Sequence, residues 1–316
     1  MKRRKKRRSA GSPWKQASLI LLVACVTGLI ALWLIPDGDQ RGTPPAPKLQ
    51  AARDKAPDTA APDPTGPASA GKRKRGGKTV AILIDDIGYD PEALRRLLAI
   101  EAPLAFSVLP HTPHARSSAE TIHRAGREVL LHLPMEPHGW PDRDPGRGAL
   151  FASMTEREIR QVLLEDLESV PRARGANNHM GSKLMEARDP IRAVFRVLQE
   201  KGLYFVDSLT TEASVGPGLA AEGSLRFAQR DLFIDDAVDR SRAAIHLETL
   251  LDAREPWSEL LLIGHPYPET VSALEETIPR FRAAGIRVVP LSELVDGRQD
   301  RRDARPQRNT NRNETP

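Results

Sequence analysis

Two adjacent carboxylates, Asp85 and Asp86, directly follow the apolar run Val80–Ile84 in the stretch VAILIDDIGYD. A run of this kind is typical of a strand that is buried on both faces of a parallel sheet. Both carboxylates cannot remain ionised and unpaired at the end of such a strand, because burial and mutual repulsion oppose it. We therefore predict a divalent cation beside them. The alternative is that one carboxylate caps the next turn while the other faces water.

Further carboxylate and imidazole residues lie at or just after the ends of later apolar runs. They are His132, His179, Asp207, Asp235 and His265. Parallel βα folds assemble their chemical groups at the C-terminal ends of the strands. This pattern predicts a metal or acid/base site along one rim of the fold. The competing interpretation, a set of unrelated helix caps, would require the same residue types to recur by chance.

The elements that must position these residues alternate along the chain between Lys78 and Val295. Short apolar runs alternate with amphipathic segments, which is typical of an α/β fold. Helix starts are marked by Asp90-Pro91-Glu92 and by the capping box Thr155–Glu158, whereas 216–223 is predicted to be a loop. About seven or eight βα units in roughly 220 residues predict a closed or nearly closed barrel of parallel strands. The alternative is an open, doubly wound sheet.

The charge of the chain is unevenly distributed. Residues 78–297 contain 25 Lys and Arg against 34 Asp and Glu, a net charge of −9, and the remaining residues carry +14. The basic character therefore belongs to the two ends and not to a binding face of the domain. Nucleic acid is not an expected partner.

The N-terminal end predicts attachment to a membrane. Residues 1–17 form a basic cytoplasmic segment, and 18–35 form an uncharged apolar run that is long enough to cross a bilayer as a signal anchor. The positive flank predicts an inner-membrane protein of bacteria, whose C-terminal bulk lies in the periplasm or outside the membrane. Two alternatives remain open, namely a cleaved signal peptide and a lipoprotein modified at Cys25, which follows Leu-Val-Ala.

Two segments have the composition of disordered chain. Residues 36–77 are rich in Pro and Ala, and residues 298–316 form a polar tail with little to bury. Cys25 is the only cysteine, so the predicted domain 78–297 has no disulfide and no thiol nucleophile.

The motifs around the rim residues resemble the divergent polysaccharide deacetylases, a distant branch of the NodB-type carbohydrate esterases. In chain order they are ILIDDIGYD, AGREVLLHLPMEP, NNHMGS, FVDSLTT, RDLFIDD and IGHPYPET. The resemblance covers nearly the whole of 78–297 and implies a deformed (β/α)7 barrel. It also implies a hydrolase that removes acetyl groups from a glycan with a metal-bound water. Catalytic roles are implied for Asp85 as the base, His265 as the acid, and Asp207 as the residue that orients this pair.

The resemblance implies a metal site with one departure from the pattern of the NodB-type enzymes. Asp86 and His132 match two ligands, but Glu136 stands where a second histidine is expected four residues after the first. Carboxylate and imidazole both bind Zn²⁺, the expected ion, so either Glu136 or His179 could complete the site.

The expected partner is an acetylated glycan or a peptidoglycan-like polymer. Trp140 could stack on a sugar ring, and Asn178 is a second candidate contact for the substrate. The presence of Glu136 in place of a histidine also motivates a second hypothesis, which is not enzymatic. In that hypothesis the chain is a non-catalytic glycan-binding or scaffold protein on a deacetylase fold.

Overall fold

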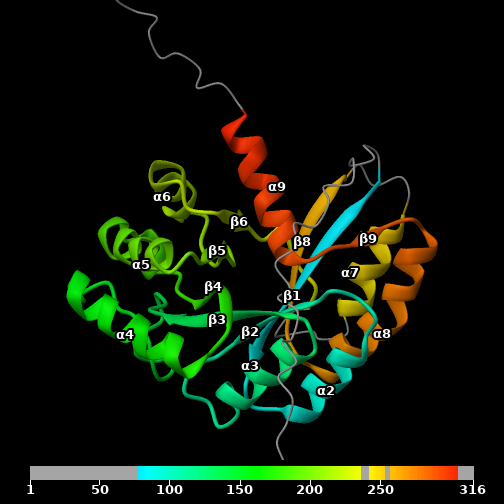
Figure 1. The fold of residues 1–316 in the computed structure, drawn as a ribbon, viewed down its shortest axis with the longest axis horizontal. Helices are drawn as coiled ribbons and strands as arrows, with labels where there is room; N and C mark the ends of the chain where they lie inside the picture. The colour runs from blue at the N-terminus through cyan, green and yellow to red at the C-terminus, as the bar shows by residue number, and fades with distance from the viewer. Residues whose placement is uncertain (1–76, 236–241, 253–256, 305–316) are drawn as a thin grey trace, which may run out of the picture. The chain divides into compact units, whose positions relative to one another are not determined.

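The computed structural model describes residues 77–235, 242–252 and 257–304, in which parallel strands alternate with helices (Figure 1). The strands are β1 (Thr79–Ile87), β2 (Ala105–Val108), β3 (Glu128–Met135), β4 (Ala173–Met180), β5 (Tyr204–Asp207), β6 (Phe227–Gln229), β7 (Leu232–Phe233), β8 (Glu259–Gly264) and β9 (Arg287–Val288). The helices are α2 (Pro91–Ala99), α3 (Ala115–Arg124), α4 (Glu156–Ser169), the short 3-10 helix η1 (Leu184–Glu186), α5 (Arg188–Glu200), α6 (Gly216–Gly223), α7 (Arg242–Leu251), α8 (Pro268–Ala283) and α9 (Leu291–Asp303).

The strands form one parallel sheet that curls like part of a barrel. Their order is β6-β5-β4-β3-β2-β1-β8-β7, and β9 pairs with the beginning of β1. Within the described residues no ladder joins β6 to β7, so the sheet keeps two edges. The α/β prediction is confirmed, and the structure is a curled, incompletely closed barrel.

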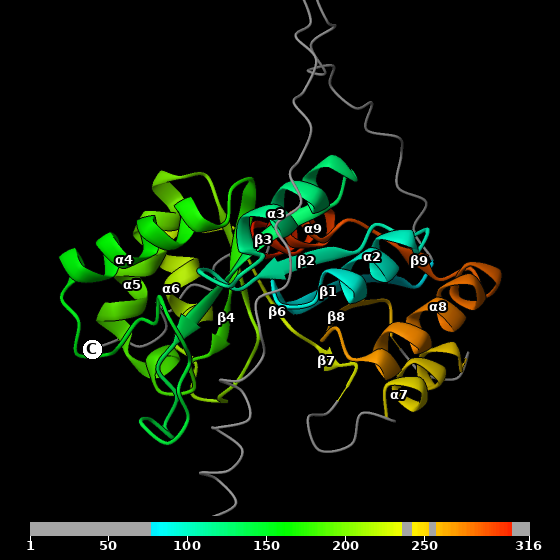
Figure 2. The ribbon, with the colours of Figure 1, turned by 90° about the horizontal axis from the view of Figure 1, so that it is seen from below.

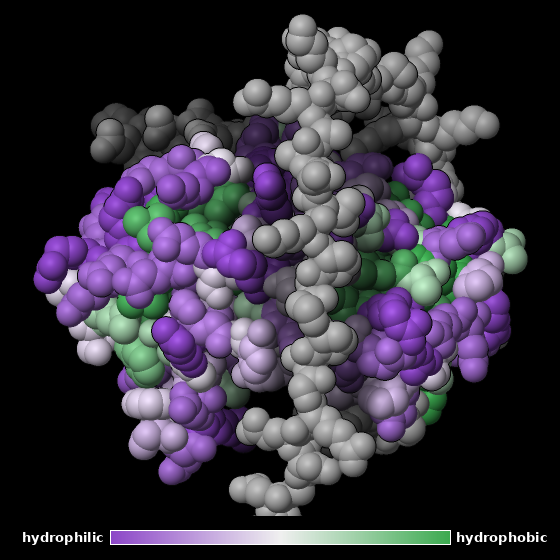
Figure 3. Space-filling view, turned by 60° about the horizontal axis from the view of Figure 1, so that its bottom comes forward, coloured by the Kyte–Doolittle hydropathy of each residue, from purple (hydrophilic) through white to green (hydrophobic). Residues whose placement is uncertain are grey.

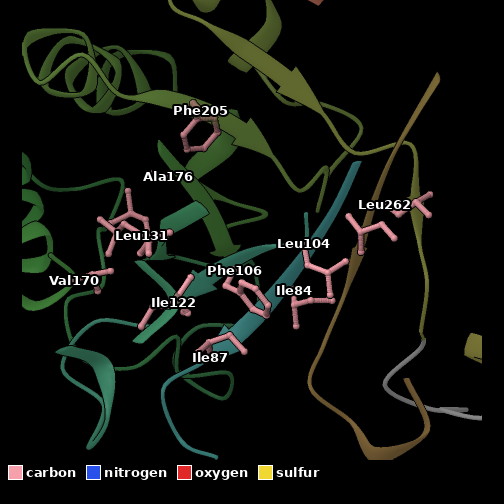
Figure 4. Packing of buried hydrophobic residues seen from close by; sticks show 14 of the residues in the cluster. Ile84, Ile87, Leu104, Phe106, Ile122, Leu131, Val170, Ala176, Phe205 and Leu262 are labelled. Carbon is pink, nitrogen blue, oxygen red and sulfur yellow. The ribbon is translucent and has the colours of Figure 1, made fainter. Parts of the chain in front are cut away.

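The outer face of the sheet packs against the helices. Val80, Ile82 and Ile84 of β1 are fully buried in this layer, together with residues such as Phe106 and Leu131 of the neighbouring strands. Figure 4 shows Ile84, Phe106 and Leu131 among the packed side chains of this layer. Alternate residues of β1 point the other way, and Ala81 and Leu83 are equally buried in a second cluster. Burial on both faces explains the uninterrupted apolar run and confirms that prediction.

Helix α9 fills the inner side of the curl. Leu291, Leu294 and Val295 join Ala81 and Leu83 in the inner cluster. The same helix is anchored by Glu128 of β3, whose carboxylate accepts hydrogen bonds from the Ser292 hydroxyl at 2.7 Å and the Tyr204 hydroxyl at 2.8 Å. Burial of this apolar stripe explains why a mostly polar sequence forms a helix here.

Two boundaries differ from the sequence prediction. Helix α9 continues past 297 to Asp303, because Arg298 pairs with Asp231 and lies 3.2 Å from Glu259, so the predicted polar tail begins inside a helix. Residues 216–223, predicted as a loop, form α6, which has a proline in its first turn and buries Leu219.

Helix starts follow local sequence chemistry. The Asp90 side chain accepts from the backbone N–H groups of Glu92 and Ala93 at the start of α2, and Thr155 and Glu158 form the predicted capping box of α4.

Figure 2 shows α4 and α5 grouped at one side and α7 and α8 at the other. In the coloured part of the face shown in Figure 3, hydrophilic residues predominate and smaller apolar areas lie between them.

In the described ranges no helix combines the length and apolar character that a bilayer span requires. The predicted anchor 18–35, its flank 1–17 and nearly all of the predicted linker 36–77 lie outside those ranges.

Candidate active site

The end of β1 turns both aspartates toward the rim of the sheet. Asp86 has a left-handed backbone with φ 56°, and the register of β1 against β2 shifts between Ile84 and Ile87. Bulges of this kind re-aim side chains and are frequent beside active sites. As a result Asp85 and Asp86 both face the neighbouring strands, with Asp85 almost completely buried.

Three ligand atoms from three strands converge at this rim. Asp86 Oδ1 lies 3.2 Å from His132 Nε2 and 3.2 Å from His179 Nδ1, and the two ring nitrogens are 3.2 Å apart. His132 belongs to β3 and His179 to β4, which pair directly. We call Asp86, His132 and His179 the rim triad.

Asn177 connects the rim triad to Asp85. Its amide nitrogen donates to both Asp85 oxygens, at 2.9 and 3.0 Å, and its amide oxygen lies 3.0 Å from His132 Nδ1. With Nδ1 donating to this oxygen, His132 Nε2 presents its lone pair to the rim triad. The same amide oxygen accepts from the Ser107 hydroxyl, and Asn177 itself is fully buried.

His265, after β8, faces the same rim and is held by Asp235. Its Nδ1 lies 2.7 Å from Asp235 Oδ1, and its backbone N–H donates to Asp235 Oδ2, also at 2.7 Å. The other ring nitrogen, Nε2, points toward the rim triad and lies 4.0 Å from Asp86 Oδ2. The ring stacks against Phe233 and Tyr267, which fixes its plane.

The electrostatics of the site favour positive charge. Burial raises the pKa of Asp85, and His132, His265 and the Asn177 amide offset this only in part. Burial also acts to raise the pKa of Asp86, but the imidazoles of His132 and His179 bring it well below its ordinary value. Burial opposes protonation of His265, yet Asp235 outweighs it and raises the pKa of His265 to about 9.

The residues of the rim triad fit a divalent cation. Tetrahedral Zn²⁺ with bonds of about 2.0–2.1 Å separates its ligand atoms by about 3.3 Å, close to the three observed separations. Asp86 Oδ1 is buried but accepts no hydrogen bond, although two ring nitrogens lie beside it. One carboxylate and two imidazoles also form a donor set that leaves a coordination position open for a water or substrate.

A pocket opens beside the rim triad. Asp86 and His179 line a cavity of about 280 Å³, together with Tyr89, Pro134 and Arg147. Tyr89 is 64% exposed, so one aromatic face is available at this pocket. An exposed aromatic ring next to a candidate metal site is suited to contact with a sugar ring.

Comparison with known proteins assigns the chain to a family. The sequence model for divergent polysaccharide deacetylases matches residues 82–295. The chain belongs to the divergent polysaccharide deacetylase family. YibQ of Escherichia coli K12 is 32% identical over 217 residues, which covers 69% of this chain and 67% of YibQ.

The chain is also similar to a second sequence relative and to a solved structure. A Haemophilus influenzae protein is 28% identical over 211 residues, which covers 67% of this chain and 72% of that protein. The crystal structure of a protein from Agrobacterium tumefaciens C58 has a TM-score of 0.63 at 21% identity, covering 69% of this chain and 89% of the other. The last similarity is one of fold.

Two predicted deacetylase residues contact partners outside the rim triad. Glu136, predicted as a metal ligand, instead accepts from the Lys183 ammonium and the Ala152 N–H at 2.7 and 2.8 Å, because the chain leaves β3 just before it. His179 occupies the third corner of the rim triad. Asp207 accepts from Leu209 N–H and the Ser214 hydroxyl in its own loop, so the contact with His265 comes from Asp235 and not from Asp207.

The two residues predicted to contact substrate, Asn178 and Trp140, do not line the pocket beside the rim triad. The Asn178 side chain accepts from Ser208 N–H and donates to the Met180 carbonyl, which ties two loops together. Trp140 packs edge-to-face on Phe151 with ring centroids 5.0 Å apart and does not line the pocket beside the rim triad. Tyr89 lines that pocket instead.

The sequence did not single out Asn177, and it did not identify Asp235 as the partner of His265. Side chains alternate along a strand, so Asn177 shares the face of His179, and it also pairs directly with His132 across β3 and β4. The register Phe233↔Ile263 between β7 and β8, continued by two residues, brings Asp235 to His265. Alternation along β4 is a sequence signal that could have identified Asn177, whereas the pairing of β7 with β8 is seen only in the structure.

Proposed function

We propose that the chain is a metal-dependent hydrolase that removes acetyl groups from a polysaccharide of the cell envelope. The observation that carries this proposal is the rim triad, three ligand atoms with equal 3.2 Å separations, beside a buried carboxylate and a carboxylate-held imidazole. Membership of the divergent polysaccharide deacetylase family supports a glycan as the substrate class.

The chain supplies two proton-transfer groups for the reaction. Asp85 is the proposed base, since its raised pKa makes it a stronger acceptor for a proton of the attacking water. His265 is the proposed acid, because its pKa of about 9 keeps the imidazole protonated at neutral pH. Its Nε2 proton passes to the leaving amine or alkoxide as the bond to the acetyl carbon breaks. Asp235 positions His265 and stabilises the charged ring.

The metal site would be formed by Asp86, His132 and His179. A bound Zn²⁺ would polarise the acetyl carbonyl and lower the pKa of water. Asn177 would orient both neighbours. Its amide oxygen would hold the His132 ring so that the Nε2 lone pair faces the metal site, and its amide nitrogen would hold the Asp85 carboxylate in place. Tyr89 would support the sugar ring in the pocket.

We further propose that residues 18–35 anchor the protein in the inner membrane, with the deacetylase domain on the outer side. Support comes from the apolar run and its basic N-terminal flank in the sequence. This topology would place the domain beside envelope glycans.

Acetate release from N-acetylated and O-acetylated oligosaccharides, with Zn²⁺ supplied, tests the activity. Asp85→Asn and His265→Gln should each reduce turnover by about 100-fold or more, as expected for loss of a general base or acid. His123→Gln, on an exposed position of α3, is the matched control and should leave turnover unchanged. Acetate release that is equal in wild type and both site variants would contradict the proposal. Glycan binding without acetate release would favour the non-catalytic hypothesis.

A further inference from the structure

Arg147 places a positive charge in the pocket beside the rim triad. It follows β3 in the loop that leads toward α4 and lines the same cavity as Asp86 and His179. Its side chain is exposed and, among the described residues, makes no ion pair or hydrogen bond, although its charge acts through space on Asp166 and His111. A guanidinium presents several donors in a planar fork that suits a carboxylate.

Two acidic residues, Asp86 of the rim triad and Asp144, line the pocket with Arg147, and neither forms an ion pair with it. Asp144 lines the same pocket, but its carboxylate accepts from the Gly146 N–H at 2.9 Å and forms a local turn. Arg196 and Arg160 differ in this respect, because they pair with carboxylates of neighbouring helices. Arg147 therefore remains available to an anionic group that enters the pocket.

The loop that carries Arg147 packs against Asp166, which contacts His111. Gly148 has φ 85° and packs so closely on Asp166 that a Cβ would lie 2.2 Å from Asp166 Oδ1. Asp166 is fully buried in α4, and its Oδ1 lies 2.8 Å from His111 Nε2. Only glycine combines this conformation with this close approach. The position of Arg147 is thus built into the fold and does not depend on a freely moving loop.

We propose that Arg147 binds a carboxylate carried by the substrate glycan and selects acidic acetylated polysaccharides. The inference rests on the proposed function, because it assigns the substrate class of the same site. Tyr89 would contact the sugar ring, the rim triad would face the acetyl group, and Arg147 would pair with the carboxylate of the same or an adjacent sugar. That carboxylate could belong to a uronic acid ring or to a lactyl ether substituent.

Binding of four probes to the full-length protein tests the proposal. The probes are a hexasaccharide of alternating N-acetylglucosamine and glucuronic acid, a tetrasaccharide of N-acetylglucosamine and N-acetylmuramic acid with free lactyl carboxylates, and the methyl amide of each. Binding is measured by calorimetry in an Asp85→Asn background, so that the acetyl groups stay intact. Arg147→Gln is compared with Arg143→Gln, an exposed arginine of the same loop that does not line the pocket.

Arg147→Gln should weaken binding of a carboxylate probe by about 10- to 100-fold, the usual range for loss of a charged hydrogen-bonding partner. Binding of the matching methyl amide should change by less than about 2-fold, and Arg143→Gln should have no effect. Loss confined to one acid probe identifies the uronate or the lactyl group as the source of the carboxylate. Gly148→Ala should produce the same selective loss, because it displaces the loop from Asp166.

Two results would overturn the proposal. One is equal affinity of the parent protein for the acid and amide forms of both probes, absence of binding included. The other is an Arg147→Gln variant that keeps the parent's preference for the acid form, whether its affinity for both forms is unchanged or equally reduced. Because binding is measured without turnover, a protein that selects the acid probes but releases no acetate would refute the proposed hydrolase and leave this inference standing.

Discussion

Asp235→Asn should shift the alkaline limb of the pH profile of the proposed acetate release to lower pH. The variant keeps the size of the side chain and an oxygen that can accept from His265 Nδ1, but it removes the buried negative charge 2.7 Å from the ring. In the wild type the pKa of His265 is about 9 against an ordinary value of 6.5. That difference corresponds to roughly 3 kcal/mol of stabilisation of the charged ring.

The size of the effect follows from the fraction of His265 that is protonated. Without Asp235 the remaining influences are burial, which lowers the pKa, and the Asp85 and Asp86 carboxylates, which raise it. We expect a value near 6.5, so at pH 7.5 the protonated fraction falls from about 97% to about 10%. The kcat/KM of the variant should therefore be about 10-fold lower at pH 7.5, and most of this loss should disappear near pH 5.5 relative to wild type.

The assay is kcat/KM for acetate release between pH 5 and pH 10. The alkaline limb, which reports deprotonation of the acid in the free enzyme, should move from about 9 to about 6.5. Asp207→Asn is the matched control, because Asp207 is also a buried aspartate at a strand end but contacts Leu209 and Ser214. An alkaline limb that stays in place in Asp235→Asn, or that moves equally in Asp207→Asn, would refute the role given to Asp235.

Two further predictions concern buried polar groups. Asn177→Ala removes the amide from Asp85 and the acceptor from His132, so denaturant titration should show a free energy of unfolding lower by about 1–3 kcal/mol. Chelator competition should also show Zn²⁺ affinity weaker by about 10- to 100-fold, and wild-type values in both assays would contradict the bridging role. Burial raises the pKa of Asp166 to about 8 from 3.8, so between these values the folded state holds a proton that the unfolded state releases. The free energy of unfolding of the wild type should therefore fall, relative to Asp166→Asn, by up to about 1.4 kcal/mol per pH unit as the pH rises from about 4 to about 8. A difference that is constant with pH, or that changes in the opposite direction, would contradict a neutral Asp166 beside His111.

Much of the fold could be predicted because its signals are local. The apolar run of β1 is buried on both faces, and the capping box of α4 forms as its residues indicate. Helix α9 could not be delimited in the same way, because its apolar stripe of Leu291, Leu294 and Val295 is short. It acquires a partner only when the sheet curls around it.

The sequence predicts which residues of the candidate site lie at strand ends. It does not predict the direction in which their side chains point. His132 and His179 follow from their positions on neighbouring strands, whereas Glu136 was given equal standing because spacing along the chain does not report where a strand ends. The structure shows that β3 ends at Met135, after which Glu136 turns to Lys183. The partner of His265 depends on the pairing of β7 with β8, and β7, with two residues, is too short for its register to be inferred from apolar periodicity.

The most direct test of the account is the metal content of the purified full-length protein after equilibration with excess Zn²⁺ and removal of unbound ion. The wild type should retain about one Zn²⁺ per chain, and Asp86→Ala, His132→Ala and His179→Ala should each lose it while remaining folded by circular dichroism. Glu136→Gln is the discriminating control and should retain the ion, because Glu136 pairs with Lys183 outside the rim triad. Retention of Zn²⁺ by all three triad variants, or no retention by a folded wild type, would contradict the central claim.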